Sequence, residues 1–125
     1  MRPRQLLAVL ACGALLPSEA GVAEGTKGSV TLCGWFENPT PANVSLIDRS
    51  GEWIIGVQGG HQADGDWPVF KPSQWVRTNG NYGYGCACIS GEVDAEAREV
   101  LSIRSAKAKP LSACRKDRAL KKPAS

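Results

Sequence analysis

Residues 79 to 89 read Asn-Gly-Asn-Tyr-Gly-Tyr-Gly-Cys-Ala-Cys-Ile, and this stretch decides the fold. Side chains along a β-strand alternate between its two faces. Read as a strand, it carries Tyr82, Tyr84, Cys86 and Cys88 on one face, and the other face carries Gly83, Gly85, Ala87 and Ile89. Cys86 and Cys88 are too close in sequence to be natural partners of each other. Each needs a distant cysteine, so two other parts of the chain are expected to lie against this strand.

The N-terminus has the layout of a secretory signal peptide. Arg2 and Arg4 precede an apolar run at residues 6–16, which is too short to span a bilayer. We therefore expect a signal peptide at residues 1–23, and a periplasmic or secreted mature chain with no integral membrane segment. The alternative is a lipoprotein, lipid-anchored through Cys12.

Four cysteines remain after removal of the signal peptide: Cys33, Cys86, Cys88 and Cys114. An even number in a small exported chain indicates disulfide bonds, because exported compartments are oxidising. A bond between Cys86 and Cys88 would have to close across a single extended residue, which strains disulfide geometry. We expect Cys33 to pair with one of these two and Cys114 with the other, and the sequence leaves the choice open.

Two alternatives to structural disulfides remain. A Cys-x-Cys pair can act as a redox couple, but nothing basic adjoins Cys86 or Cys88 in sequence to lower a thiol pKa. Four cysteines can hold zinc, but the usual Cys-x-x-Cys spacing is absent. The sequence therefore favours structural disulfides.

Alternating segments predict a single β-rich domain at residues 24–115. Strands are expected at residues 29–36, 44–47, 53–57, 75–76, 82–93 and 100–103. Gly51 suits the left-handed position of a bulged hairpin within residues 44–57. A short helix is expected from Pro110 to Cys114, with Pro at its first position. These elements predict a mainly β fold, a small disulfide-tied, partly closed β-barrel or curled antiparallel sheet with one short C-terminal helix. An open sheet packed on one helix is the alternative.

Charge is unevenly distributed along the chain. Residues 24–103 hold five basic and ten acidic residues, whereas the chain from Arg104 onward holds eight basic residues and one acidic residue. A basic end can bind nucleic acid, an anionic membrane or an acidic partner. An exported protein seldom meets nucleic acid, so we expect no nucleic-acid partner and interpret residues 116–125 as a basic flexible tail.

The segment at residues 59–66 has no periodicity and is predicted to be a loop. It contains His61, which is the only histidine in the sequence. A hydrolytic triad needs a histidine as its base, so the sequence gives such a site little support. Asp64 and Asp66 offer oxygens for calcium, but no glutamate follows at the distance that a calcium loop requires. We interpret these residues as turn formers, and we expect no catalytic residue, no metal and no cofactor.

Aromatic residues are numerous for a small domain: Trp35, Phe36, Trp53, Trp67, Phe70, Trp75, Tyr82 and Tyr84. Most are expected to fill a core that has few aliphatic residues. Trp67 and Trp75 bracket an irregular segment, where side chains are often presented to a partner. Together with Tyr82 and Tyr84 they are the candidate ligand-binding residues. Gly83 and Gly85 leave one strand face bare, which would admit either a ligand or a closely packed backbone.

Long motifs at residues 33–44, 51–53 and 78–88, followed by shorter matches up to residue 115, resemble an uncharacterised family of small exported bacterial proteins, domain of unknown function 4087. The resemblance covers most of the mature chain. It implies a bacterial exported protein, and it carries over no catalytic residue, ligand or partner.

These features favour an exported, non-enzymatic binding module, expected to be a monomer, whose ligand is a protein or an envelope polymer. One alternative is an exported thiol-disulfide protein that uses Cys86 and Cys88. Another is a structural protein of the envelope. A hydrolytic enzyme has the least support in the sequence, which has one histidine and no nucleophile motif.

Overall fold

The computed structural model describes Gly13 and residues 27–123. The expected signal peptide and the alternative anchor at Cys12 lie outside these residues. The elements are β1 (Lys27–Thr40), β2 (Asn43–Asp48), β3 (Gly51–Gly56), a 3₁₀ turn η2 (Pro72–Gln74), β4 (Trp75–Asn79), β5 (Tyr82–Asp94), β6 (Glu99–Lys109) and α1 (Leu111–Arg115).

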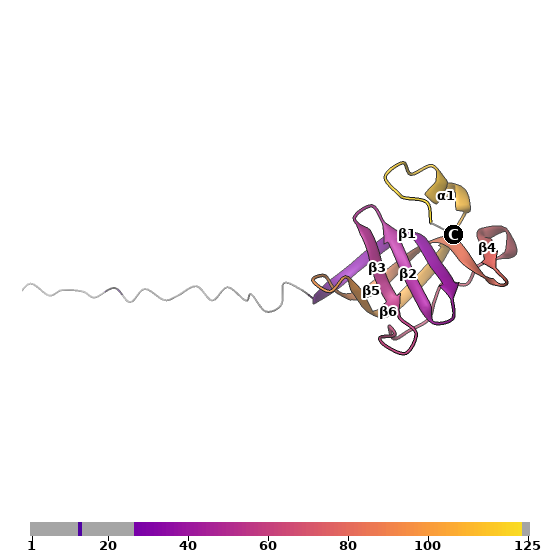
Figure 1. Ribbon diagram of the computed structural model, residues 1–125. Helices are drawn as coiled ribbons and strands as arrows, with labels where there is room; N and C mark the ends of the chain where they lie inside the picture. The colour runs from indigo at the N-terminus through magenta and orange to yellow at the C-terminus, as the bar shows by residue number, and fades with distance from the viewer. Residues whose placement is uncertain (1–12, 14–26, 124–125) are drawn as a thin grey trace, which may run out of the picture.

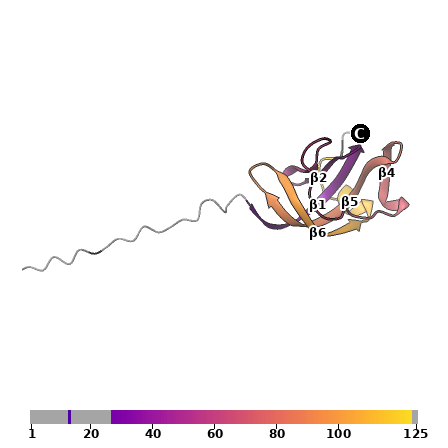
Figure 2. The same ribbon diagram turned by 90° about the horizontal axis from the view of Figure 1, so that it is seen from below.

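The strands form one strongly curled sheet, in the order β1-β2-β3-β6-β5-β4, and β1 also pairs with β5. Five strands therefore follow one another around a ring, and β4 is attached to the edge of β5 (Figures 1 and 2). All pairings are antiparallel except a single parallel contact between β3 and β6. The predicted mainly β fold is confirmed, as a ring-like sheet rather than a regular barrel.

Strand β5, which includes the tyrosines and cysteines of residues 82–88, is the centre of the sheet. It pairs with β1, β6 and β4. The face with Ala87 and Ile89 points into the ring, where the main core lies. The buried core residues are Leu32, Phe36, Val44, Leu46, Trp53, Ile55, Ala87, Ile89, Val93, Val100 and Ile103. The opposite face of β5 contributes Tyr84 and Cys86 to a second, outer core.

Helix α1 covers this outer core, as the sequence predicts. Cys114 is buried in it beside Trp35, and Leu111 packs at its border. Figure 1 shows α1 lying across the end of the sheet. The segment after α1, expected to be a flexible tail, contacts the domain as well: Leu120 packs against the outer core, and the Asp117 carboxylate lies 2.9 Å from Nε of Arg49.

The ring is closed by residues 61–64, between β3 and β6. The backbone N–H of Ala63 donates to Ile55 O (2.8 Å), and that of Asp64 donates to Leu101 O (3.1 Å). The N–H of Ile103 donates in turn to Asp64 O (2.7 Å). The predicted loop thus bridges two strands that share one parallel pair. Gly65 follows at φ +100°, and a Cβ there would lie 2.1 Å from Ile103 O, so a side chain is excluded.

Three strands, β1, β4 and β6, run well past the residues that their sequence patterns indicate. The sequence predicts a first strand that ends at residue 36, yet β1 continues through Pro39 to Thr40 with a register shift between Glu37 and Thr40. A shift of this kind accommodates a residue that has no N–H to donate. Strand β6 continues from Ile103 to Lys109, because backbone pairing with β5 holds this part although its apolar alternation has ended.

Candidate functional site

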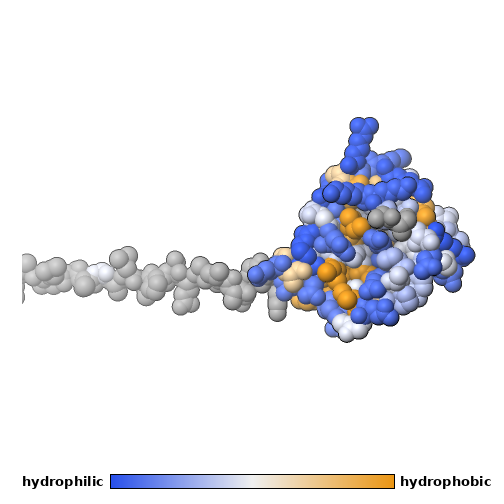
Figure 3. Space-filling model, in the orientation of Figure 1, coloured by the Kyte–Doolittle hydropathy of each residue, from blue (hydrophilic) through white to orange (hydrophobic). Residues whose placement is uncertain are grey.

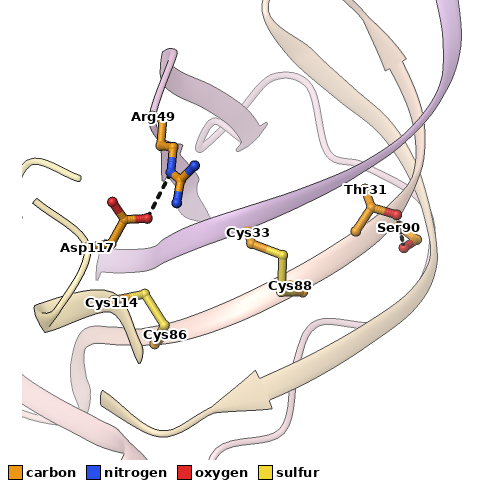
Figure 4. The surroundings of a disulfide bond; sticks show 8 residues. All are labelled: Thr31, Cys33, Arg49, Cys86, Cys88, Ser90, Cys114 and Asp117. Atoms are coloured by element: carbon orange, nitrogen blue, oxygen red, sulfur yellow. Dashed lines mark hydrogen bonds and ion pairs between the residues drawn. A yellow bond between two sulfur atoms is a disulfide. The ribbon is translucent and has the colours of Figure 1, made fainter. Parts of the chain in front are cut away.

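The two disulfides both start from β5 and leave it toward different partners (Figure 4). Cys33 of β1 is bonded to Cys88, directly opposite in the sheet, and Cys86 is bonded to Cys114 of α1. The choice that the sequence left open is thereby decided by strand register. Cys86 and Cys114 are each 3 % exposed, whereas Cys33 is exposed and Cys88 is half-buried.

The exposed disulfide has a cation beside it. Lys107 of β6 is directly opposite Cys88 of β5, and opposite residues in an antiparallel pair share a face. The row Cys33, Cys88, Lys107 therefore crosses three strands on the outer face. No basic residue adjoins Cys88 in sequence, so this neighbour became visible only with the pairing of β5 and β6.

A groove lies at the other end of β5, on the face that points into the ring. Two rows of residues cross β1, β5 and β4 here. The first row is Phe36, Gly85 and Trp75, and the second row is Asn38, Gly83 and Arg77. Glycine thus occupies the middle of both rows, between larger side chains on the flanking strands.

Phe70 fills the space above the first glycine. A Cβ at Gly85 would lie 2.5 Å from the Phe70 ring, so the bare strand face accommodates a packed side chain. The Phe70 ring centroid lies 4.9 Å from that of Trp75 and 5.6 Å from that of Phe36. Trp67 joins the cluster at 6.0 Å from Phe36 and keeps 38 % of its surface exposed. The irregular segment is therefore held in place by aromatic packing.

The groove next to this cluster has a volume of about 610 Å³, within the range of ligand pockets. It is lined by Phe36, Asn38, Trp67, Pro68, Phe70, Lys71, Pro72, Trp75, Arg77 and Asn81. The lining combines aromatic side chains with two amides and two cations. No acidic residue lines it, and within residues 27–123 neither Lys71 nor Arg77 lies within 4.0 Å of a carboxylate.

The four candidate ligand-binding residues do not form one site. Trp67 and Trp75 meet at the groove. Tyr84 is on the opposite face of the sheet, 5 % exposed, with its ring centroid 5.2 Å from that of Trp35. Tyr82 shares the strand face of Tyr84 and is half-buried. The candidate residues therefore divide between the groove and the outer core.

Sequence reasoning missed the polar half of the groove. Asn38 follows an expected strand, and Arg77 belongs to a strand whose end the pattern did not reach. Neither has a sequence signal, because their proximity depends on the pairing of β1 and β4 with β5. For Phe70 the sequence does offer a signal, because it lies between Pro68 and Pro72 in the segment that the two tryptophans bracket.

Two carboxyl groups have shifted pKa values. Partial burial, and secondarily the neighbouring Glu52 carboxylate, raise the pKa of Glu37 on the outer face of β1. A side-chain hydrogen bond from Arg49, followed by one from the backbone of Ala119, lowers the pKa of Asp117. Neither Glu37 nor Asp117 lines the groove, so neither shift indicates acid–base chemistry at the candidate site.

His61 and Asp64 both contact β6 through polar atoms. The Nε2 atom of His61 lies 2.7 Å from Val100 O, and Asp64 pairs through its backbone with β6. In the part of the chain that the structure describes, no three His, Cys, Asp or Glu side chains gather as a metal site. None of the helices in this part is long and apolar enough to cross a bilayer.

A family model described as a protein of unknown function, DUF4087, matches residues 27–121. The chain belongs to this family. The match begins with β1 and ends just after Leu120, so the family domain includes the segment that packs behind α1. No curated protein and no solved structure matches the chain.

Proposed function

We propose that this DUF4087 member is an exported, non-enzymatic binding module whose ligand, a protein or an envelope polymer, occupies the aromatic groove. The observation that carries the proposal is the groove itself, where partly exposed Trp67 and Trp75 line the same surface as Lys71 and Arg77, two cations with no carboxylate within 4.0 Å among residues 27–123. Tryptophan and arginine dominate the energetics of many interfaces. Trp75 and Arg77 are on strand β4, and Trp67 packs against Phe36 of β1, so these side chains are held before binding and lose less entropy.

Two further features support export. The N-terminal sequence has the pattern of a signal peptide. The two disulfides are compatible with an oxidising compartment, where such bonds persist. A signal peptidase cleavage product found in the periplasm or medium is the expected result of expression in the native cell.

Binding through the groove is tested with the Trp67→Ala variant. Purified protein is incubated with isolated peptidoglycan and, separately, with envelope proteins under cross-linking conditions. We expect capture by the unaltered protein and a loss of about tenfold or more in affinity for the variant, as for an interface hot spot. Val57→Ala removes another exposed apolar side chain, away from the groove, and serves as the matched control. Equal capture by Trp67→Ala and Val57→Ala contradicts the proposal.

A second candidate function, thiol–disulfide exchange, is favoured by the exposed Cys33–Cys88 bond. The alternative couple of Cys86 with Cys88 is not formed in the structure, where the two are bonded to different partners. Exchange would begin with attack of a partner dithiol's thiolate on Sγ of Cys33. A new sulfur–sulfur bond forms to the partner, the Cys33–Cys88 bond breaks, and Cys88 leaves as a thiolate beside the Lys107 cation.

Partial reduction of the folded protein tests this candidate. With limiting dithiothreitol followed by alkylation and mass mapping, we expect Cys33–Cys88 to open first while Cys86–Cys114 stays intact. Lys107→Gln should slow the opening, since the leaving thiolate loses its neighbouring charge. Lys116→Gln removes an exposed cation elsewhere as the control. Reduction of both bonds only together with unfolding would exclude exchange as a function.

A further inference from the structure

We propose that the groove recognises an extended acidic peptide, which adds to the edge of β4 and directs a carboxylate to Arg77. This inference rests on the proposed function, because it names the ligand class of the same groove. Three features of the site lead to it: the charges of the lining, the unpaired edge of β4, and the spacing of Trp75 and Arg77.

The charges of the lining select the chemistry of the ligand. Lys71 and Arg77 both line the groove, and no acidic residue does. Arg77 is exposed and has no carboxylate within 4.0 Å among residues 27–123. Guanidinium groups bind carboxylates through paired, charge-assisted hydrogen bonds. A ligand carboxylate at Arg77 would therefore complete an ion pair that the folded chain leaves unmade.

The edge of β4 favours a peptide over a glycan. Within the described chain β4 pairs only with β5, so its second edge has no strand partner. Thr78 and Asn79 at this edge are exposed, and β4 contains no proline that would block pairing. Backbone N–H and C=O groups along such an edge are satisfied by an added strand. A sugar chain has no backbone that repeats at the spacing of these groups.

The spacing along β4 defines the peptide pattern. Trp75 and Arg77 are two residues apart, so both lie on the groove face of the strand. Residues of an added strand that face them are also two apart. An acidic residue opposite Arg77 therefore requires an apolar residue two positions away, opposite Trp75. The apolar residue precedes the acidic one if the peptide runs parallel to β4, and follows it if antiparallel.

Selection from a displayed library of random peptides tests the inference on the full mature protein. We expect enriched peptides to have Asp or Glu two positions from an aliphatic or aromatic residue. A synthetic enriched peptide should lose about tenfold or more in affinity with Arg77→Gln. Arg118→Gln makes the same charge change at an exposed position outside the groove and should bind as the unaltered protein does. Binding should also slow hydrogen exchange of the β4 amides.

The outcomes separate this inference from the proposed function. Enriched peptides without an excess of acidic residues, or an unchanged affinity in Arg77→Gln, overturn carboxylate recognition. The proposed function, binding of a ligand in the groove, is not contradicted by either result. Peptidoglycan capture that depends on Trp67, with no peptide enriched, overturns the peptide ligand but supports the proposed function. Absence of capture of any envelope component, together with no enriched peptide, contradicts both.

Discussion

Glu37 is a residue whose charge opposes folding. It lies on β1 beside Ser45 of β2, and the Ser45 hydroxyl donates to the Glu52 carboxylate at 2.6 Å. Partial burial and the nearby Glu52 charge raise the pKa of Glu37 in the folded protein above its ordinary value of 4.5. The folded state therefore binds this proton more tightly than the unfolded state does. The protonated Glu37 carboxyl therefore adds to the free energy of unfolding below pH 4.5, and this contribution is lost as the pH rises through the pKa of the folded state.

We therefore expect Glu37→Gln to stabilise the protein at neutral pH. The gain should be on the order of 0.5 kcal/mol, because solvent screens a group that is only partly buried. It should vanish below the ordinary pKa of Glu37, where both proteins are neutral at this position. Urea denaturation from acid to neutral pH measures the difference. Glu96→Gln removes one negative charge from an exposed turn as the control, and a gain that is independent of pH contradicts the assignment.

At the scale of elements, the disulfides connect β5 to two different structures. Cys33–Cys88 joins strands that already pair along most of their length. Cys86–Cys114 joins α1 to the sheet, and α1 otherwise holds its place through the small outer core. The docking of α1 therefore depends on one disulfide, whereas the pairing of β1 with β5 does not.

Removing the second disulfide should release α1. In a Cys86→Ala, Cys114→Ala variant we expect a loss of about 3.5 kcal/mol from loop entropy. Amides after residue 110 should lose protection from hydrogen exchange, while the strands keep theirs. The paired Cys33→Ala, Cys88→Ala variant loses a disulfide too, but α1 should stay docked in it. Continued protection of α1 in the first variant would show that packing alone holds the helix.

The sequence predicted the strands whose apolar and polar residues alternate, and the turns and helix that Gly or Pro marks. The structure has the cysteines on one face of β5 and the hairpin turn ending at Gly51, and its helix begins at Leu111, one residue after the predicted start at Pro110. Residues 104–109 were missed as strand, because backbone pairing with β5 holds them without apolar alternation. The groove was half predicted: Trp67 and Trp75 follow from their irregular segment, whereas Asn38 and Arg77 depend on register between strands that are distant in sequence.

For the whole molecule, the decisive feature is the closure of the ring. Strands β3 and β6 share a single residue pair, Ile54 with Glu99. Arg98, directly before β6, adds hydrogen bonds to Ile54 and Glu52 of β3, and residues 61–64 bond through their backbone to both strands. If this segment separates, β3 and β6 become open edges and the main core between them meets water. Cooperative unfolding of the domain should therefore depend on a segment that has little secondary structure of its own.

Ala63→Pro tests this dependence, since proline removes the N–H that donates to Ile55 O. We expect a loss of about 3 kcal/mol or more, the cost of proline at a backbone donor position. Ala63→Gly keeps the N–H and should cost about 1 kcal/mol or less. Hydrogen exchange should then show β3 and the first half of β6 opening before β1 and β5, whose pairing does not involve the segment. Equal losses in the two variants would mean that side-chain packing, rather than the backbone bond of Ala63, closes the ring.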